Sequence, residues 1–408
     1  MADVIVVGGG AAGMVAAWRA ASRGHGVILL EANGRPGVKL RLSGGGTCNI
    51  THAGPVKELL AAFSPEQARF LRPALHRFTN EDVLALLRRE GIETYVRDNG
   101  RVFPLDRPGS AVQVVAAFET LVQRAGARLQ CGARVGALAT AERRALGVRV
   151  GDELLQADAL ILATGGASYP ETGTRGEVAE WLKALGIPVA PWFPALAPIP
   201  LQVPRPEWEG VAFRDGTLLL LAGSGGKRLA AFAGDIVFTR AGISGPAALE
   251  LSRATEAARR GGGACLAYAF ASEALVEADL EQTRNRQPHL GVRTWLAQRL
   301  PERACAQSLE ALGLPPGQRF KDLSRAHARS VKALVSAFPL GAPQCVPLSR
   351  GEVAAGGVRL EAVDPQTMKV RGWENLWVCG ELLDVDGPVG GYNLQAAFST
   401  GFVAGDSV

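Results

Sequence analysis

A glycine-rich turn that follows directly on a short apolar strand constrains this chain more than any other feature. Residues 3–7 have the β-branched composition of a buried parallel strand, and the run Gly-Gly-Gly-Ala-Ala-Gly over 8–13 follows without a gap. An alanine-rich segment at 14–22 has helical composition, and a second apolar run at 27–30 ends at Glu31. The pattern predicts a βαβ unit with a Gly-x-Gly-x-x-Gly turn.

Each glycine of this turn has a separate role in such a unit. Gly8 permits the tight turn, Gly10 lets the backbone approach a pyrophosphate, and Gly13 lets helix and strand pack closely. Ala11 and Ala12 lie at the start of the helix, where free N–H groups and the helix dipole favour an anion. We therefore assign all five residues to dinucleotide binding.

Glu31 lies 18 residues after Gly13, at the end of the second strand. A carboxylate there can accept hydrogen bonds from the hydroxyls of an adenosine ribose, and it disfavours a 2′-phosphate. The turn therefore suits FAD or NAD better than NADP. A glycine-rich loop without a ligand would not account for strand, helix, second strand and acid in this order.

A second glycine-rich loop favours FAD over NAD. It follows at 37–49, soon after the first unit, and suits the extended ribityl and isoalloxazine parts of FAD. Lys39, near its start, can neutralise a phosphate. The loop residues that we assign to the cofactor are Ser43, Gly44, Gly45, Cys48 and Asn49.

A third segment resembles the turn that closes the FAD domain of flavoproteins with two dinucleotide sites. An apolar strand at 159–163 ends in an Ala-Thr-Gly turn, which places Ala163, Thr164 and Gly165 at the cofactor. A strand predicted at 128–138 brings the backbone of Val135 to the adenine edge.

A fourth segment combines a strand at 376–379, a polar turn and an alanine-rich helix that extends to about 404. Gly390 and Gly391 open the helix, whose positive end can stabilise negative charge on the flavin. Asp384 and Asp386 can hold ribityl hydroxyls, which we favour, or cap the helix. Further residues assigned to the cofactor are Gly380, Glu381, Asn393, Leu394 and Gln395.

These motifs together resemble the BaiN-like family of bacterial flavoproteins, also described as aminoacetone-oxidase-like NAD(P)/FAD-dependent oxidoreductases. The resemblance extends nearly end to end and includes the runs at 234–239 and 242–246. Val38 and Thr47 depart from the family pattern, which has arginine at both positions. The resemblance implies a flavoprotein with a cap inserted into its FAD domain, and it leaves the substrate open.

The predicted fold is α/β, a Rossmann-like FAD-binding domain of the glutathione-reductase-like kind, formed by 1–190 and 346–408. A proline-rich stretch from 191 to 206 marks a boundary. We expect an inserted β-rich subdomain at 191–271 and a helical subdomain at 272–345. Residues 354–357, Ala-Ala-Gly-Gly, are predicted to form a flexible turn that faces the site.

The chain has no second strand-bound Gly-x-Gly-x-x-Gly, so we expect no built-in NAD(P)H domain. A nicotinamide or another electron donor would approach transiently. A dithiol relay at Cys48 is excluded because the second cysteine of such a loop would stand at Ala53. Cys48 is then either a single thiol near the flavin or a small residue that packs within the loop. His52 and Tyr392 are candidates for catalytic acid or base, with structural roles as the alternative.

The expected function is hydride transfer between bound FAD and a small organic substrate, an unsaturated carbonyl compound or an amine. One alternative is an amine oxidase that uses oxygen. Another is a flavoprotein that acts on RNA through the segment 284–332, which has ten Lys or Arg and three Asp or Glu. Only Trp295 and Phe320 are aromatic there, which disfavours a nucleic-acid partner.

Composition adds an expectation about the compartment. No stretch approaches eighteen apolar residues, so we expect no membrane partner. The six cysteines are scattered without a Cys-x-x-Cys pair, which suits a reducing cytoplasm. We assign no metal ligands.

Overall fold

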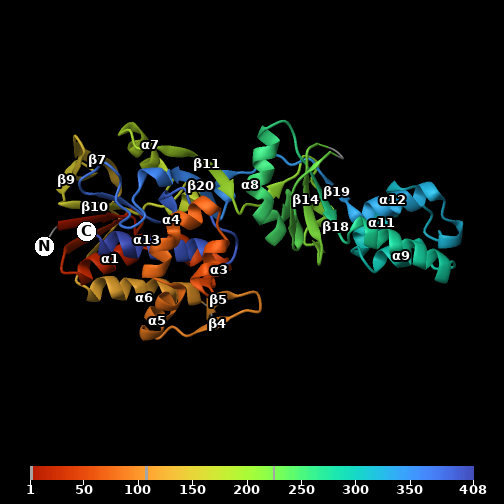
Figure 1. Cartoon of the computed structure of the whole chain (residues 1–408), viewed down its shortest axis with the longest axis horizontal. Helices are drawn as coiled ribbons and strands as arrows, with labels where there is room; N and C mark the ends of the chain where they lie inside the picture. The colour runs from red at the N-terminus through yellow and green to blue at the C-terminus, as the bar shows by residue number, and fades with distance from the viewer. Residues whose placement is uncertain (1–2, 106–108, 224–225) are drawn as a thin grey trace. The chain divides into compact units, whose positions relative to one another are not determined.

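The computed structural model describes residues 3–105, 109–223 and 226–408, which form two compact units (Figure 1). The first unit comprises Met1–Phe193 and Leu348–Val408, and the second comprises Pro194–Pro347. The first unit is therefore built from both ends of the chain, as a chain with an inserted cap requires.

A five-stranded sheet forms the centre of the first unit. Its strands lie in the order β21 (Leu376–Val378), β10 (Ala159–Leu162), β1 (Asp3–Val7), β2 (Gly26–Glu31) and β6 (Arg128–Cys131). Every neighbouring pair is parallel, so all five carboxyl ends lie at one edge. From β1 the chain continues to β2 on one side of the sheet, whereas β10 lies on the other side of β1. Ligands of open parallel sheets bind at the carboxyl ends of the strands, at the point where the strand order reverses in this way.

Two helices pack on each other unusually closely beside this sheet: α1 (Ala11–Ser22) and α13 (Tyr392–Asp406). A Cβ atom on Gly401 would lie 2.3 Å from the carbonyl oxygen of Ala12, and one on Gly405 would lie 2.2 Å from that of Ala16. Small residues at i and i+4 on both helices therefore bring the two backbones together.

The other elements of the first unit surround this core. They are α2 (Val38–Leu42), η1 (Ser43–Gly46), β3 (Thr51–His52), α3 (Val56–Ala61), α4 (Pro65–Arg77), α5 (Asn80–Arg89), β4 (Thr94–Val96), β5 (Arg101–Pro104), α6 (Ser110–Arg124), β7 (Val135–Ala141), β8 (Arg144–Val150), β9 (Glu153–Gln156), η2 (Pro170–Thr172), α7 (Glu177–Ala184), β11 (Val189–Ala195), η5 (Leu348–Arg350), β20 (Val353–Val358), η6 (Leu360–Ala362) and η7 (Gly380–Leu382).

Two expectations about this unit are wrong. The strand expected at 128–138 is two strands, because Gly132 turns the chain with φ 72°: β6 joins the parallel sheet and β7 joins the antiparallel sheet β7-β8-β9. The turn expected at 354–357 is the fully buried strand β20, paired with β11. Its glycines serve close packing, since a Cβ on Gly356 would lie 2.3 Å from the carbonyl oxygen of Pro191.

Two four-stranded antiparallel sheets form the centre of the second unit. The strands of the first sheet are, in order, β12 (Ile199–Pro200), β17 (Gly242–Ser244), β16 (Ile236–Thr239) and β13 (Ala212–Phe213). Those of the second are β15 (Arg228–Ala233), β14 (Thr217–Leu221), β18 (Cys265–Ala269) and β19 (Phe338–Gly341). Aromatic rings pack between them, among them Trp208, Phe213, Phe238 and Phe338.

Helices complete the second unit (Figure 1). They are η3 (Pro206–Trp208), α8 (Pro246–Arg260), α9 (Glu273–Arg286), α10 (Val292–Ala297), α11 (Glu302–Ala311), η4 (Phe320–Asp322) and α12 (Arg325–Ser336). Helix α8 begins directly at Pro246 and is fifteen residues long. Among the residues that the structure describes, no helix is both long and apolar enough to cross a membrane.

Candidate functional site

The glycines of the first turn differ in what surrounds them. Gly8 has φ 103°, and a Cβ there would lie 2.5 Å from the carbonyl oxygen of Ala163; a Cβ on Gly13 would lie 1.8 Å from that of Gly8. Both are glycine because protein atoms leave no room. A Cβ on Gly10 would meet no described atom within 4 Å. Open space at Gly10 is what a bound pyrophosphate requires.

The start of α1 is free to receive an anion. Gly10 is its N-cap, no side chain caps the helix, and no acidic residue lies in its first turn. The first N–H groups of a helix have no intrahelical acceptor, and the dipole adds positive character there. Gly380 follows β21 at the same sheet edge, and a Cβ on it would lie 2.7 Å from the Cβ of Ala12.

Glu31 is buried and already accepts three hydrogen bonds. Gly9 N donates to Oε2 at 2.7 Å, and Asn33 donates to Oε1 through its backbone N at 2.8 Å and its Nδ2 at 2.7 Å. A carboxylate has about four acceptor positions, so room for one further donor, such as a ribose hydroxyl, remains on Oε2. Asn33 escaped the sequence analysis because a polar residue after a strand carries no distinctive signal.

Lys39 belongs to a polar cluster that joins three distant segments. Its Nζ forms an ion pair with Glu381 at 2.7 Å and donates to Ser168 Oγ at 2.6 Å. Glu381 also accepts a hydrogen bond from Ala354 N at 2.9 Å. The charge of Lys39 is therefore paired within the protein, and a phosphate would compete with Glu381 for it.

The turn at 163–165 contributes a polar atom without a partner. Ala163 N continues the sheet by donating to Val7 O at 2.8 Å, and Gly165 turns the chain with φ 78°. The Oγ1 of Thr164 between them is buried and has no hydrogen-bond partner among the described residues. An unsatisfied buried hydroxyl costs about 1–3 kcal/mol, so this residue fits a site that a ligand completes.

The loop at 43–49 has left-handed backbone at Gly44, Gly45, Gly46 and Cys48, with φ between 58° and 88°. Cys48 is fully buried, and its N–H donates to Ser43 O at 2.9 Å. Burial raises the pKa of the Cys48 thiol to about 12, although Ser43 acts in the opposite direction. The thiol therefore stays protonated at neutral pH, which suits a packed residue and not a reactive one.

The start of α13 brings His52 and Tyr392 together. Their rings stack with centroids 4.6 Å apart and an interplanar angle of 20°. His52 Nδ1 donates to Gly390 O at 3.1 Å, since a carbonyl only accepts. The carboxamide of Asn49, oriented to satisfy its neighbours, accepts a hydrogen bond from Gly391 N at 2.9 Å.

Several residues assigned to the cofactor hold the protein together in this structure. Asp384 accepts a hydrogen bond from Gly356 N at 3.0 Å, and Asp386 accepts one from Gln67 Nε2 at 2.9 Å. The N-cap of α13 is Gly391, which has no side chain to cap the helix. Contacts within the protein are also made by Val135, with Val150; by Asn393, with Gly387; by Leu394, with the apolar core; and by Gln395, with Thr51, Phe78 and Ser399.

Tyr169 is a further candidate that the sequence analysis missed. It follows the Ala-Thr-Gly turn and has a left-handed backbone with φ 49°, which is uncommon outside glycine and asparagine. Burial raises the pKa of its phenol, with smaller contributions from Glu352 and Glu171. The phenol therefore stays protonated and can donate a proton. Its neighbour Ser168 belongs to the Lys39 cluster.

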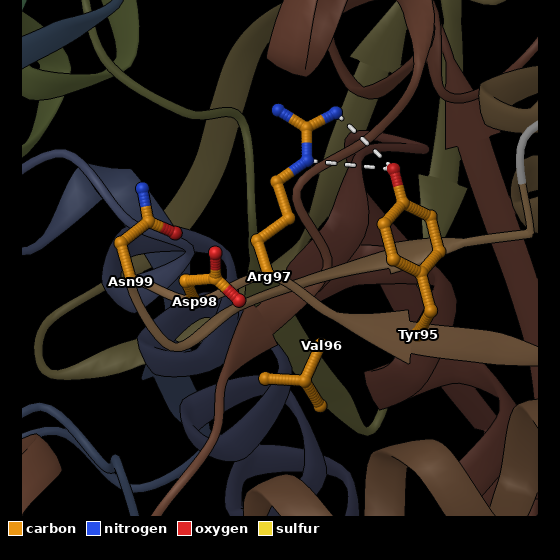
Figure 2. Close-up of a pocket in the computed structure, with 5 residues that line it drawn as sticks. All are labelled: Tyr95, Val96, Arg97, Asp98 and Asn99. Carbon is orange, nitrogen blue, oxygen red and sulfur yellow. Dashed lines mark hydrogen bonds between the residues drawn. The ribbon is translucent and has the colours of Figure 1, made fainter.

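A pocket of about 410 Å³ lies on the hairpin β4–β5 (Figure 2). Figure 2 shows Arg97 reaching toward the Tyr95 hydroxyl, to which it donates at 3.2 and 3.4 Å. The hairpin adjoins His52, because Arg101 of β5 pairs with His52 of β3 and a Cβ on Gly100 would lie 2.4 Å from His52 Nε2. The pocket is lined by Tyr95, Val96, Arg97, Asp98 and Asn99.

Comparisons with known proteins agree with this geometry. The HI0933-like protein Rossmann domain family matches residues 2–407. The chain is 29% identical to the ribosomal RNA dihydrouridine synthase of Escherichia coli K12 over 408 residues, 98% of this chain and 96% of that one. It is 29% identical to the 3-dehydro-bile acid delta(4,6)-reductase of Clostridium scindens over 420 residues, with 98% and 97% covered.

Solved structures share the fold. The 3-ketosteroid-delta4-(5alpha)-dehydrogenase of Rhodococcus jostii RHA1 aligns with a TM-score of 0.53 at 18% identity, over 100% of this chain and 96% of its own. The predicted family and the predicted Rossmann-like α/β fold are therefore confirmed. The chain belongs to the HI0933-like family and is an FAD-dependent oxidoreductase.

Proposed function

We propose that this protein is a reductase that uses bound FAD to add hydrogen across a carbon–carbon double bond conjugated to a carbonyl group. The two kinds of relative named above share this chemistry. Reducing uridine to dihydrouridine saturates the C5–C6 bond of uracil, which is conjugated to the C4 carbonyl. A delta(4,6)-reductase of a 3-dehydro-bile acid saturates double bonds conjugated to a 3-keto group.

The open space at Gly10 is the observation that carries the cofactor assignment. In the proposal, the turn at 8–13 and the start of α1 hold the pyrophosphate, and Glu31 accepts a ribose hydroxyl. Thr164 Oγ1 has an unused hydrogen bond to offer toward the same edge of the sheet. When bound, FAD supplies the hydride that such a reduction needs.

The protein's own task is to supply a proton and to stabilise negative charge. Saturating an enone places a hydride on the β-carbon and a proton on the α-carbon, and negative charge develops on the carbonyl oxygen in between. Tyr392 carries a phenolic hydroxyl at the start of a fifteen-residue helix, where the dipole favours negative charge. Stacked His52 orients the ring, so we assign Tyr392 as the proton donor.

A pair of alanine substitutions tests the cofactor assignment. Gly10→Ala places a methyl group in space that no described atom occupies, so the apoprotein should keep its unfolding temperature while its affinity for FAD falls at least tenfold, about 1.4 kcal/mol. Gly13→Ala is the matched control, because its methyl group would lie 1.8 Å from Gly8 O and should destabilise the apoprotein itself. Unchanged FAD affinity in Gly10→Ala, measured by flavin fluorescence titration, would refute the assignment.

The reaction itself is tested with a simple enone. Wild-type protein reduced chemically under anaerobic conditions should be reoxidised by cyclohex-2-enone, with cyclohexanone formed in equal amount. A saturated ketone serves as the control and should leave the reduced flavin spectrum unchanged. Reoxidation by oxygen together with turnover of a primary amine, and none by the enone, would instead support an amine oxidase.

A further inference from the structure

Arg101 brings a positive charge next to the pair formed by His52 and Tyr392. It lies on β5 directly opposite His52 of β3, and residues paired in this way point to the same face of a sheet, with Cβ atoms about 5 Å apart. Thr51 and Val102, the neighbouring pair, are fully buried, whereas Arg101 and His52 are half-buried on the opposite face. Because the His52 ring stacks on Tyr392, the Arg101 side chain begins close to the proposed proton donor.

The charge of Arg101 is available to a ligand, in contrast to that of two other cations of the first unit. Lys39 forms an ion pair with Glu381 at 2.7 Å. Arg97 donates to the Tyr95 hydroxyl through two of its nitrogens (Figure 2). The guanidinium group of Arg101 has no carboxylate within 4 Å and no hydrogen-bond partner among residues 3–105, 109–223 and 226–408.

Two further side chains in this part of the first unit also lack a hydrogen-bond partner among the described residues, Glu352 and Tyr169. Glu352 stands two residues before the N–H of β20 that Glu381 accepts at 2.9 Å, and Tyr169 follows Ser168 of the same polar cluster. Desolvation raises the pKa of the Glu352 carboxyl group, and the charge of Arg101 opposes this rise. Arg101 and Glu352 therefore interact electrostatically across more than 4 Å, without the contact that would neutralise the guanidinium group.

An arginine in this position can hold negative charge on an oxygen but cannot supply a proton. Its guanidinium group stays protonated and offers several N–H donors in one plane. In an enone, the carbonyl oxygen and the α-carbon are bonded to the same carbon, so the group that stabilises the oxygen must lie beside the group that protonates the α-carbon. Arg101 meets this requirement because it lies opposite His52, which stacks on Tyr392.

We propose that Arg101 is a catalytic residue that binds the carbonyl oxygen of the substrate and stabilises the negative charge that develops there during reduction. The inference rests on the proposed function and adds a residue to it. No bond to Arg101 forms or breaks. The hydride goes to the β-carbon and the proton of Tyr392 goes to the α-carbon, while Arg101 keeps its own protons and lowers the energy of the charged oxygen between them.

The first test compares two acceptors for the electrons of the reduced flavin. FAD-loaded protein is reduced chemically without oxygen and mixed in a stopped-flow instrument with cyclohex-2-enone or, at high salt, with ferricyanide, which builds no charge on a carbonyl oxygen. Arg101→Gln should slow reoxidation by the enone about 10²–10³-fold, the usual loss for one removed oxyanion donor, and should leave reoxidation by ferricyanide within about threefold of wild type. Because cyclohex-2-enone has no carboxylate, a lost contact with an acidic group of the substrate cannot explain this result.

Two variants check that the effect belongs to the guanidinium group at this position. Arg101→Lys keeps the positive charge and should recover part of the lost rate. Arg89→Gln removes an exposed arginine from the last turn of α5 and should match wild type. All three variants should keep the wild-type unfolding temperature and FAD affinity. An Arg101→Gln variant that is as fast as wild type with the enone, or that is slowed equally with both acceptors, would overturn the inference.

Binding of a phenolate separates this inference from the proposed function. A phenolate places a negative oxygen on a flat six-membered ring, as the enolate of cyclohex-2-enone does, but it is not reduced. In calorimetric titrations of the oxidised, FAD-loaded protein, 4-chlorophenol should bind wild type at least tenfold more tightly than Arg101→Gln, a difference of about 1.4 kcal/mol.

The two readouts can fail independently. Wild-type protein that binds the phenolate through Arg101 but reduces no enone refutes the proposed reaction and supports Arg101 as the group that binds a negative oxygen. Wild-type protein that reduces the enone, with an Arg101→Gln variant that matches it in enone rate and in phenolate affinity, refutes the role of Arg101 and leaves the reductase intact.

Discussion

At the scale of single residues, the candidate site depends on side chains whose neighbours lie far away in sequence. His52 and Tyr392 stack although 340 residues separate them, and Lys39 pairs with Glu381. A partly buried ion pair or a stacked ring holds its position because each partner limits the other's rotamers. The polar residues of the site are therefore ordered before any ligand arrives, which is what efficient proton transfer requires.

Replacing Tyr392 by phenylalanine tests the proton donor. Tyr392→Phe keeps the ring that stacks on His52 but removes the hydroxyl, so reoxidation of the reduced protein by cyclohex-2-enone should slow by about 10²–10⁴-fold. FAD affinity should stay within threefold of wild type. Tyr169→Phe is the matched control, since burial raises the pKa of the Tyr169 phenol and keeps it protonated; a larger loss in this variant would move the donor role to Tyr169.

Cysteine labelling tests the passive role of Cys48. Because burial raises the pKa of this thiol to about 12, iodoacetamide at pH 8 should leave it unmodified in the folded protein. Cys131 and Cys345, which are exposed, should react under the same conditions and serve as internal controls. Cys48→Ser should keep the rate of enone reduction within a few-fold of the wild-type rate. Modification of Cys48 before Cys131, as monitored by mass spectrometry, would contradict the passive role.

At the scale of elements, helix α13 connects the site to the stability of the first unit. Its first residues contact His52, and its last residue, Asp406, receives Arg19 at 2.6 Å and Arg23 at 3.1 Å, together with Arg77. A carboxylate at a helix C-terminus is unfavourable with respect to the dipole. Three guanidinium groups from α1, the turn after it and α4 offset this cost and anchor the helix.

Asp406→Asn should destabilise the protein in a pH-dependent way. Burial alone would raise the pKa of Asp406, but the hydrogen bond and charge of Arg19, with the charges of Arg77 and Arg23, hold it below its ordinary 3.8. A carboxyl whose pKa is lowered by folding stabilises the protein above its unfolded pKa, about 3.9, and this contribution is lost as pH falls through the folded value.

The expected loss at pH 7 is about 1–3 kcal/mol by urea unfolding. The difference from wild type should shrink as pH falls below about 4. Asp152→Asn, at an exposed turn without such partners, should behave as wild type at every pH. A pH-independent difference for Asp406→Asn would show that its effect does not come from the ion pairs.

At the scale of the whole molecule, we expect the parallel sheet of the first unit and the glycine-rich turn at 8–13 to serve all nucleotide binding. The described strands of the second unit pair only in antiparallel fashion, so they contain no βαβ unit that could hold a nicotinamide dinucleotide. The positive charge of the segment 284–332 offers phosphates a weak attraction that salt screens. We therefore expect the reductant to reach the flavin from a transient complex.

NADH and NADPH should accordingly reduce the flavin slowly. Anaerobic stopped-flow reduction should not saturate at low micromolar cofactor, and its rate should fall when salt rises from 50 to 200 mM. Dithionite is the control and should reduce the same sample completely. Fast, saturable reduction by NADPH that is insensitive to salt would reveal a nicotinamide site that the strand topology does not indicate.

The sequence by itself determined the local parts of this protein. Strand, turn and helix over 3–22, the acid at Glu31 and the turn at 163–165 all lie as predicted, because nearest-neighbour sterics and apolar periodicity decide such units. The parallel order of the central sheet follows from short strands joined through helices. Open space at Gly10, in contrast to Gly8 and Gly13, also agrees with the roles read from the motif.

Only the tertiary structure decided which polar groups are already paired. The sequence offered Lys39 to a phosphate and Asp384 and Asp386 to the ribityl chain, whereas folding gives them Glu381, Gly356 and Gln67 as neighbours. These partners lie between 28 and 342 residues away along the chain, and no local pattern encodes such contacts. The same holds for the cations at the end of α9 and the start of α12, which meet because the two helices pack antiparallel.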